Sequence, residues 1–239
     1  MNTDLLTRPA EPEDLAEVAE LYLATRRAAV PQMPPMVHPV DEVHAYVARL
    51  PETKEVWVAE RDDIVGFLVL DGAWLDALYV GPAHQSTGVG STLLDLAKGL
   101  RPEGFGLWVF ASNTGARGFY HRHGLVELEH TDGSANEERA PDVRMAWPGT
   151  APLTYLRGQI DEVDDQLALL LARRFALTAT VQGFKERGGR EGRDPAREAE
   201  IAERMARHVP GLGVGAVSRI MDVVIGESLD AHASGNSRS

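Results

Sequence analysis

Three basic residues at fixed intervals along one predicted helix are the first feature of the sequence with chemical meaning. Arg174 and Lys185 are eleven residues apart, about three turns or roughly 16 Å of helix, and Arg157 lies further back. An arginine binds a carboxylate through two parallel hydrogen bonds, and a lysine binds it as a point charge. Two long cationic side chains leaning toward each other from the ends of this span could therefore enclose a small dianion.

A second polar cluster stands where the next helix is predicted to begin. Asp194 precedes Pro195 as an N-cap residue precedes a proline in the first helical position, and Arg197 and Glu198 follow. Backbone N–H groups at a helix start lack partners within the helix, so hydrogen-bonding groups converge there. These residues are further candidates for the site.

Helices are the elements that position both groups. Apolar residues recur every three or four positions from Leu153 to Phe184, which predicts one helix of more than thirty residues. Such a helix has no compact body to lie on in so short a domain, so we expect a partner chain with a matching stripe. We expect Gly188-Gly189 to end it, a second helix from Asp194 to about His208, and a third over the apolar positions Val217 to Leu229.

The whole series resembles the AroQ-type chorismate mutases, short all-α domains of three helices that intertwine as dimers. The resemblance covers about residues 153–232 and rests on Leu156-Arg157-x-x-Ile160-Asp161-x-x-Asp164, Leu169-Leu170-x-x-Arg173-Arg174, Lys185, Asp194-Pro195-x-Arg197-Glu198 and Glu227-Ser228. It implies an enzyme that converts chorismate to prephenate. That pericyclic rearrangement requires no nucleophile, metal or cofactor. It requires carboxylates held in place and fixed donors at the ether oxygen where negative charge builds.

The resemblance also implies the role of each residue. Arg174 and, from the partner chain, Arg157 would bind the two substrate carboxylates. Lys185 would donate to the ether oxygen. Glu198 with Asp194 would hold the ring hydroxyl and the lysine.

Three further positions complete the implied site. Ser228 would lie at the ring carboxylate, and Arg197 would give backbone or supporting contacts. His232 departs from the family, in which many relatives have a glutamine as second donor to the ether oxygen. A histidine donates as one neutral tautomer or as the cation, so activity would depend on pH. A frayed helix end, with His232 touching nothing, is the alternative.

A glycine-rich turn is the chemical feature of the first half. The stretch Gln85-Ser86-Thr87-Gly88-Val89-Gly90 follows a predicted strand and opens a predicted helix. Its backbone N–H groups would point together at the positive end of a helix dipole, and glycine permits a diphosphate to approach the main chain closely. An anion is the expected occupant, although such turns often serve only packing.

A second stretch follows at the next strand and helix, Asn113-Thr114-Gly115-Ala116-Arg117-Gly118-Phe119-Tyr120 and then Gly124-Leu125. Together the two stretches resemble the GNAT acetyltransferase family, whose motifs Q/R-x-x-G-x-G/A and N-x-x-A-x-x-F-Y-x-x-x-G-F occur in this order and spacing. The resemblance runs from Leu5 to Trp147. It implies the α/β acyltransferase fold, acetyl-CoA as cosubstrate and an amine as acceptor.

By position, this resemblance implies the cofactor contacts. Leu78 and Val80 would pair through their backbone with the pantetheine arm, and Asn113 would contact the cofactor. The pyrophosphate would be held by Gln85, Ser86, Thr87, Gly88, Val89 and Gly90. The pair Ser86-Thr87 replaces a glycine and a basic residue that are frequent in the family, so one positive charge near the phosphates is missing.

The proton transfers are assigned to fewer residues. Tyr120 would protonate the thiolate that leaves when the amine attacks the thioester, and a core tyrosine with a bonded hydroxyl is the alternative. Asp76 could act as a base through a water, although an exposed structural carboxylate is the simpler interpretation, and His84 is a weaker candidate. Acceptor pockets in this family are built from variable loops, here residues 29–39 and 131–141, so the amine acceptor is unidentified.

Two prolines and a glycine at 147–152 interrupt a strand-like run and mark a domain boundary. Strand and helix signals alternate before this boundary, and no strand signals follow it. We expect an acetyltransferase domain at 1–147, a linker at 148–152, a mutase domain at 153–232 and a disordered tail at 233–239. In the first domain we expect helices at 14–29, 91–100 and 114–123, a mobile loop at 131–141, and strands at 55–60, 64–70, 74–80, 107–110 and, closing the sheet, 143–147.

Composition excludes several classes. The absence of cysteine removes disulfides, thiolate nucleophiles and cysteine-ligated zinc, and the eight histidines form no ligand pattern, so we expect no metal site. The net charge of -12 arises almost entirely before residue 151, with 12 basic against 23 acidic residues, which argues against nucleic acid and weakly favours a cationic acceptor. No apolar run approaches roughly 18 residues and no signal-peptide pattern is visible, so we expect a cytoplasmic protein without a membrane partner.

Two alternatives for the helical half remain open. Isochorismate pyruvate lyases share the helical fold, and formation of salicylate and pyruvate instead of prephenate would distinguish them. The helical half could also be a sensor that binds chorismate without turnover, attached to an acetyltransferase that is regulated or inactive.

Overall fold

The computed structural model describes residues 4–187 and 193–236, with side chains for 4–185 and 193–234. The chain divides into two compact units, Met1–Arg157 and Gly158–Ser239. Helix α5 (Pro152–Arg187) begins in the first unit, at the end of the predicted linker, and continues into the second.

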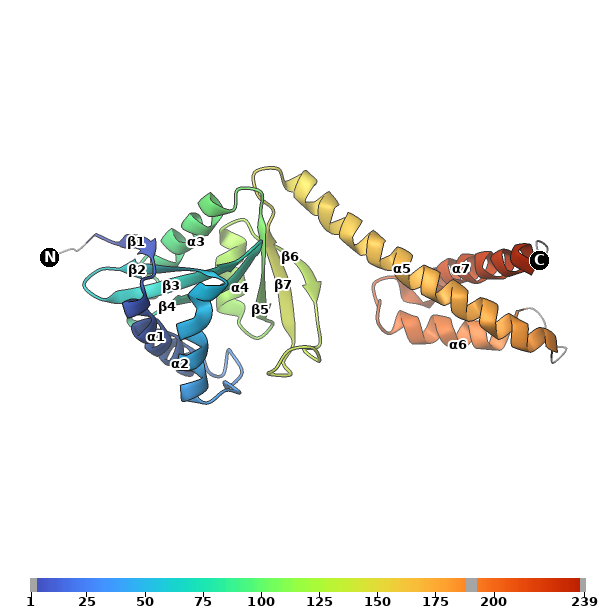
Figure 1. The fold of residues 1–239 in the computed structure, drawn as a ribbon, viewed down its shortest axis with the longest axis horizontal. Coiled ribbons are helices and arrows are strands. Elements are labelled where there is room, and N and C mark those ends of the chain that lie inside the picture. The colour runs from blue at the N-terminus through green and yellow to red at the C-terminus, as the bar shows by residue number, and fades with distance from the viewer. Residues whose placement is uncertain (1–3, 188–192, 237–239) are drawn as a thin grey trace. The chain divides into compact units, whose positions relative to one another are not determined.

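The first unit is a seven-stranded sheet with helices on both faces (Figure 1). Neighbouring strands are antiparallel except for β4 and β5, which are parallel. In the order of the sheet, the strands are β1 (Leu6–Pro9), β2 (Glu55–Glu60), β3 (Ile64–Asp71), β4 (Trp74–Val80), β5 (Phe105–Phe110), β7 (Asp142–Trp147) and β6 (Val126–His130).

Two hydrophobic clusters hold the helices to the sheet. The cluster on one face joins α1 (Leu15–Ala28) and α2 (Val40–Arg49) to β2 and β3, and the cluster on the other face joins α3 (Val89–Leu100) and α4 (Thr114–Arg122) to β3, β5 and β7. Strand β3 contributes to both because side chains alternate between the faces of a strand, with Phe67 in one cluster and Leu68 in the other. Three short 3-10 helices are η1 (Pro12–Asp14), η2 (Leu50–Glu52) and η3 (Pro82–His84).

Most predicted elements of this unit are confirmed, and four differ. Strand β1 was not predicted, because four residues are too few for a period to be recognised. The strand predicted to close the sheet occurs as β7, but it lies between β5 and β6. Strand β6 was missed because Val126–His130 is a short, largely exposed edge strand, in which Val126 and Leu128 alternate with glutamates over too few positions to indicate a strand. Helix α2 was missed because it follows a proline-rich segment and buries only Val43 and Val47.

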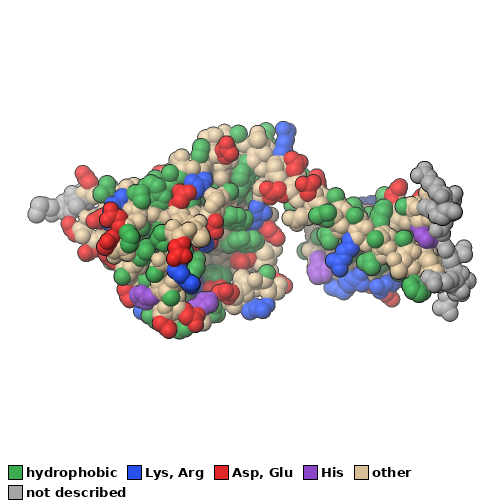
Figure 2. Space-filling view, in the orientation of Figure 1, with side chains coloured by type: hydrophobic (Ala, Val, Ile, Leu, Met, Phe, Trp, Pro, Cys, Tyr) green, Lys and Arg blue, Asp and Glu red, His purple; other side chains and the backbone are tan. Residues whose placement is uncertain are grey.

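The second unit contains α5, α6 (Pro195–Ala206) and α7 (Gly213–Asn236). Its buried cluster is small and joins α6 to α7 through Ala202, Ala206, Val217 and Met221. The apolar stripe of α5 stays largely exposed, with Leu170 at 62% and Phe184 at 67%. Figure 2 shows hydrophobic side chains on the surface of this unit. The helical unit thus leaves uncovered the stripe for which we predicted a partner.

The ends of these helices partly differ from the prediction. Helix α6 begins after Asp194 as expected. Helix α7 begins at Gly213, before Val217, the first apolar position of the predicted third helix. It continues to Asn236, so the disordered tail predicted from Ala233 is wrong for residues 233–236. Residues 188–192, which include Gly188-Gly189, and residues 237–239 lie outside the described residues.

Among the described residues, Pro152–Lys185 is long and apolar enough to cross a membrane by length and composition alone, with 6% buried. This stretch was not predicted from the sequence because it is not an uninterrupted apolar run: it contains Arg173 and Arg174. Length and composition alone are weak evidence for a span, because a helix that buries an apolar stripe against a partner has the same composition.

Candidate active sites

The first candidate site is a cavity of about 1300 Å³ where β4 and β5 separate. The parallel register of these strands contains one pair, Trp74 with Gly106, at the start of β4. Beyond that pair both strands line the cavity. The predicted residues that line it come from β4, the glycine-rich turn and α4 with its cap: Leu78, Val80, Gln85, Ser86, Gly88, Gly90, Asn113 and Tyr120.

The backbone of β4 faces this opening at two positions. Gly81 N–H donates to the Val65 carbonyl of β3 at 3.0 Å. Hydrogen-bonding directions alternate along an antiparallel strand, so Leu78 and Val80 direct their backbone groups away from β3 and toward β5. The Val80 carbonyl accepts a hydrogen bond from Gln85 Nε2 at 3.2 Å. A cofactor amide that pairs with this carbonyl has to share it with Gln85 or displace it.

The glycine-rich turn has the backbone geometry of an anion site. Gly88 is the N-cap of α3 with φ 94°, in the left-handed region that favours glycine. Because glycine has no side chain, it leaves the first N–H groups of α3 uncapped. Two residues of the motif use their side chains elsewhere: Val89 is buried in the core, and the Thr87 hydroxyl donates to the His84 carbonyl at 2.7 Å. Their contribution to phosphate binding is therefore restricted to backbone groups.

Helix α4 supplies Asn113 and Tyr120. Asn113 caps the helix, since its Oδ1 accepts from the Ala116 N–H at 3.1 Å, a role that the sequence analysis did not predict. Tyr120 is 8% exposed and lines the cavity. Burial raises the pKa of its phenol above the usual value. The hydroxyl is therefore protonated at neutral pH, as a proton donor to a thiolate has to be.

The predicted bases are less well placed. Asp76 lines the cavity, but its carboxylate accepts from Lys54 Nζ at 2.8 Å, and the same ammonium lies 3.5 Å from Asp71. This pairing supports a structural role for Asp76. His84 lies in η3. Within the part of the chain that the structure describes, no group of three His, Asp or Glu side chains is arranged to hold a metal ion.

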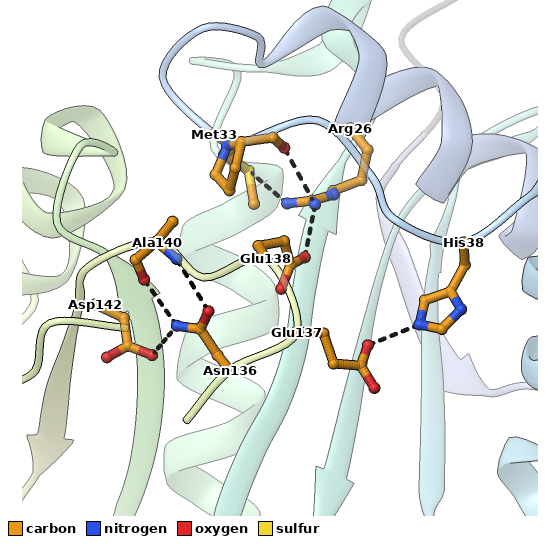
Figure 3. Close-up of polar contacts among 9 residues, drawn as sticks. Arg26, Met33, His38, Asn136, Glu137, Glu138, Ala140 and Asp142 are labelled. Carbon is orange, nitrogen blue, oxygen red and sulfur yellow. Dashed lines mark hydrogen bonds and ion pairs between the residues drawn. The ribbon is translucent and has the colours of Figure 1, made fainter. Parts of the chain in front are cut away.

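The two loops predicted to form the acceptor pocket are joined to each other and to α1. In Figure 3, Arg26 of α1 points at Glu138 of loop 131–141, with Nη2 donating to Oε1 at 3.0 Å. The same guanidinium donates to the Pro34 carbonyl of loop 29–39 at 3.3 Å. His38 lies 2.7 Å from Glu137 and joins the loops a second time. The sequence analysis missed Arg26 because nothing in the pattern of α1 marks an arginine as buried.

The second candidate site joins α5 to α7. Arg174 Nη1 donates to Ser228 Oγ at 2.9 Å and to the Val224 carbonyl at 3.4 Å. Ser228 is 2% exposed. Two predicted site residues that are 54 positions apart in the chain are thus in direct contact.

The start of α6 is built as a cap with an ion pair. The Asp194 side chain accepts from the Arg197 N–H at 3.1 Å, which confirms the N-cap. The Arg197 side chain is 56% exposed and pairs with Glu200 at 2.8 Å, so only its backbone faces the cap. Glu198 is held by Arg193, a residue that the sequence analysis did not select, at 2.9 and 2.6 Å.

Comparisons with known proteins find a family for each half of the chain. A family model described as chorismate mutase type II matches residues 156–233, and one described as acetyltransferase (GNAT) domain matches residues 52–127. The peptidyl-lysine N-acetyltransferase YjaB of Escherichia coli (strain K12) is 42% identical over 102 residues, which are 42% of this chain and 68% of that protein. The chain belongs to the GNAT acetyltransferase family. Its helical half is a type II chorismate mutase domain.

Two further comparisons concern the GNAT domain. The protein of the same name from Salmonella typhimurium (strain LT2) is 40% identical over 78 residues, 32% of this chain and about half, 52%, of that protein. The solution structure of apo-form YjaB from Escherichia coli superposes with a TM-score of 0.52 at 25% identity, covering 62% of this chain and 99% of that one. The predicted fold class, a GNAT α/β domain followed by a helical mutase domain, is confirmed.

In the mutase domain, three predicted residues lie outside the contacts just described. Arg157 is exposed on α5, 17 residues and almost five turns before Arg174. Lys185 and His232 are partly buried. His232 lies inside α7, four residues after Ser228 and so on the same face, which contradicts the frayed end considered as its alternative.

In the GNAT domain, the joined loops lead to a stability prediction. Arg26 is 2% exposed, and Glu138 is its one carboxylate partner among the described residues. Glu138→Ala leaves a buried guanidinium uncompensated, so we expect a loss of about 3 kcal/mol in the free energy of unfolding. Denaturant unfolding followed by tryptophan fluorescence measures it, because all four tryptophans precede residue 148.

The matched control is the neighbouring residue. Glu137 is 71% exposed and pairs with the half-exposed His38. Glu137→Ala should change the free energy of unfolding by less than about 0.5 kcal/mol, since exposed pairs contribute little. Equal effects of the two substitutions would contradict the structural role given to Arg26.

Proposed function

We propose that the chain is a bifunctional enzyme that converts chorismate to prephenate in its helical half and transfers acetyl groups from acetyl-CoA to an amine in its first half. The contact between Arg174 and Ser228 is the observation that carries the mutase proposal. Both residues were selected from sequence as carboxylate-binding positions, and their hydrogen bond fixes the arginine beside a buried serine. A cation held in this way is preorganised for an anionic substrate.

The mutase reaction would proceed by placement alone. Arg174 and Ser228 bind a carboxylate, and Lys185 with His232 donates to the ether oxygen as its bond to the ring breaks. Glu198 and Asp194 orient the ring hydroxyl. Donors that are fixed before the reaction stabilise the developing charge without reorganising, which is the main contribution available to an enzyme without a nucleophile or cofactor.

A second copy of the chain would complete the site. Arg157 stands almost five helical turns from Arg174 on the same helix, farther than an arginine side chain reaches. The exposed stripe of α5, including Leu170 and Phe184, is the expected contact surface for that copy. We therefore propose a homodimer in which each site takes Arg157 from its partner.

The acetyl transfer would take place in the cavity between β4 and β5. Coenzyme A would lie along the open edge of β4, pairing with the backbone of Leu78 and Val80, with its pyrophosphate on the N–H groups from Gln85 to Gly90. The neutral amine attacks the thioester carbonyl, the C–S bond breaks with the sulfur leaving as thiolate, and Tyr120 gives that sulfur a proton. The proton that the amine nitrogen loses on forming the amide passes to water, from which the Tyr120 phenol is restored. The fit of the cavity to this cofactor is supported by the uncapped start of α3 and by the part of β4 beyond Trp74, which is not paired with β5.

The acceptor would be a lysine side chain of a protein. The curated relatives are named peptidyl-lysine N-acetyltransferases. Of the carboxylates that line the cavity, Asp76 and Glu138 are paired with Lys54 and Arg26. Asp142 accepts from the neutral Thr131 hydroxyl and Asn136 amide, so its charge is the one that favours approach of a cation among these three. Chorismate and acetyl-CoA are both water-soluble metabolites, consistent with the cytoplasmic location that we expect.

Two assays on the whole protein test the proposal. Purified chain is given chorismate, and prephenate, salicylate and pyruvate are measured. It is then given acetyl-CoA with a lysine-containing peptide, and free coenzyme A is measured. Prephenate without salicylate supports the mutase. Salicylate with pyruvate, or chorismate binding without any product, would contradict it.

His232 gives a prediction about pH. A neutral glutamine donates to the ether oxygen at any pH, whereas a histidine donates as one neutral tautomer or as the cation. We expect His232→Gln to keep or raise prephenate turnover and to flatten its dependence on pH between about 5.5 and 8. Initial rates across this range measure it. A large loss of turnover at every pH would remove His232 from the site.

A further inference from the structure

Both carboxylate oxygens of Glu198, an acidic residue of the proposed mutase site, are bound by one side chain. Arg193 Nε donates to Oε1 at 2.9 Å, and Arg193 Nη2 donates to Oε2 at 2.6 Å. This is the parallel two-bond geometry in which guanidinium and carboxylate are coplanar. The two hydrogen bonds fix the plane of the Glu198 carboxylate as well as its distance from the Arg193 guanidinium.

The same guanidinium is anchored to a second helix. Arg193 Nη2 also donates to Asp222 Oδ1 on α7. Asp222 lies six residues before Ser228, the residue that binds Arg174. The orientation of Glu198 is therefore tied through Arg193 to the helix that also positions the carboxylate-binding arginine.

Each carboxylate oxygen has two acceptor positions, and Arg193 occupies one on each. The remaining two are available for the ring hydroxyl and the Lys185 ammonium, the two donors assigned to Glu198. Glu198 and Asp222 both line a cavity of about 420 Å³ beside α7, so the ion pair borders open space.

We propose that Arg193 is a positioning residue for the mutase, which aims the free acceptor positions of Glu198 at the substrate hydroxyl and at Lys185. The inference rests on the proposed function of the helical half. It assigns Arg193 no contact with the substrate. Its effect passes entirely through the glutamate.

The charge state of Glu198 supports this role. Its hydrogen bonds to Arg193 lower the pKa of the Glu198 carboxyl, and Asp222 and Asp194 oppose that effect. Arg219 lines the same cavity, and Lys185 is the further cation assigned to the site. Because the folded pKa is depressed, Glu198 stays anionic as the pH falls below its usual value of about 4.3. Removing the guanidinium leaves the two aspartates acting alone and moves the ionisation to higher pH.

The test compares Arg193→Gln, Arg193→Lys and wild type in prephenate formation. Arg204→Gln is the control, because Arg204 lies in the last turn of α6, the helix that carries Glu198, and is not part of the ion pair. We expect Arg193→Gln to lower kcat/KM about 10- to 100-fold at pH 7.5, the usual effect of removing a partner that orients a reacting group. We expect the loss of kcat/KM in Arg193→Gln to be larger at pH 5, because the fall of kcat/KM at low pH (the acid limb of the pH profile) moves to higher pH when Glu198 is protonated more readily. Arg193→Lys restores the charge without the two-bond geometry, so it should recover the acid limb but only part of the rate.

Asp222→Asn is the second variant. It keeps the pair of Arg193 with Glu198 but removes the carboxylate that anchors Arg193 to α7, so its kcat/KM should lie between those of wild type and Arg193→Gln. Thermal unfolding and sedimentation establish that each variant is folded and assembled as the wild type is. Unchanged kcat/KM and an unchanged acid limb in Arg193→Gln would overturn the inference. The inference would also be overturned if Arg193→Lys lost as much kcat/KM as Arg193→Gln at every pH. Wild type that forms no prephenate would instead overturn the function on which the inference rests.

Discussion

Arg174→Ala should reduce prephenate formation about 10³-fold in kcat/KM, at the upper end of what removing one preorganised donor costs. The substitution removes a guanidinium that Ser228 and the Val224 carbonyl hold in one orientation. No other side chain can replace it, because a bidentate clamp requires the planar fork of arginine at that position. Initial rates over a range of chorismate concentrations measure the effect.

Arg173→Ala is the matched control. Arg173 is the adjacent residue, exposed on α5, and it differs from Arg174 by about 100° around the helix axis. Its removal should leave kcat/KM within about twofold of wild type, since an exposed charge away from the substrate acts only through the screened field. Equal losses in the two variants would mean that the helix needs basic residues for folding and not for this reaction.

A mixing experiment separates the roles of the two chains of the proposed dimer. Arg157→Ala and Arg174→Ala chains should each be nearly inactive alone. If each site takes Arg157 from its partner, a mixed dimer contains one site with both arginines intact and one site with neither. Unfolding and refolding the two variants together should therefore restore a substantial fraction of the wild-type rate. No recovery would indicate that both arginines act within one chain, or that the mixed dimer does not form.

The sequence allowed the mutase site to be predicted from intervals, because a helix converts sequence spacing directly into position. Eleven residues place Arg174 and Lys185 about three turns apart whatever the tertiary packing. The same logic placed Asp194 at the cap of α6, where the side chain does accept the Arg197 N–H. Spacing along one helix says nothing, however, about which residue of another segment reaches a given carboxylate. Arg193 contacts Glu198 nearby and Asp222 29 positions away, and no local sequence pattern predicts the second contact.

In the acetyltransferase cavity, too, some features could be predicted from the sequence and others could not. The glycine-rich turn was recognisable because Gly88 adopts a backbone conformation that other residues avoid, so glycine is required there for a local reason. The separation of β4 and β5 depends on a non-local pairing that stops after Trp74 and Gly106. The buried Arg26, with a carboxylate supplied 112 residues later, is likewise a tertiary feature. The Asp194 cap and the Gly88 turn, which rest on local geometry, are thus confirmed, whereas the contacts between distant segments require the fold.

Tyr120→Phe should lower the turnover of acetyl transfer at least about 10²-fold, because general acids contribute 10² to 10⁴ in rate. Phenylalanine fills the same space, so the packing of the buried ring is retained and the KM for acetyl-CoA should change by less than about threefold. Since burial raises the pKa of this phenol, its acid form persists throughout the assay range, and wild type should show no loss of rate from its ionisation below about pH 10. The control is Tyr46→Phe on α2, where the ring is 51% exposed and the hydroxyl lies outside the cavity lining, and there we expect wild-type turnover. Release of coenzyme A with a lysine-containing peptide measures both variants. Full turnover in Tyr120→Phe would reduce the tyrosine to a core residue and leave the thiolate to be protonated by water.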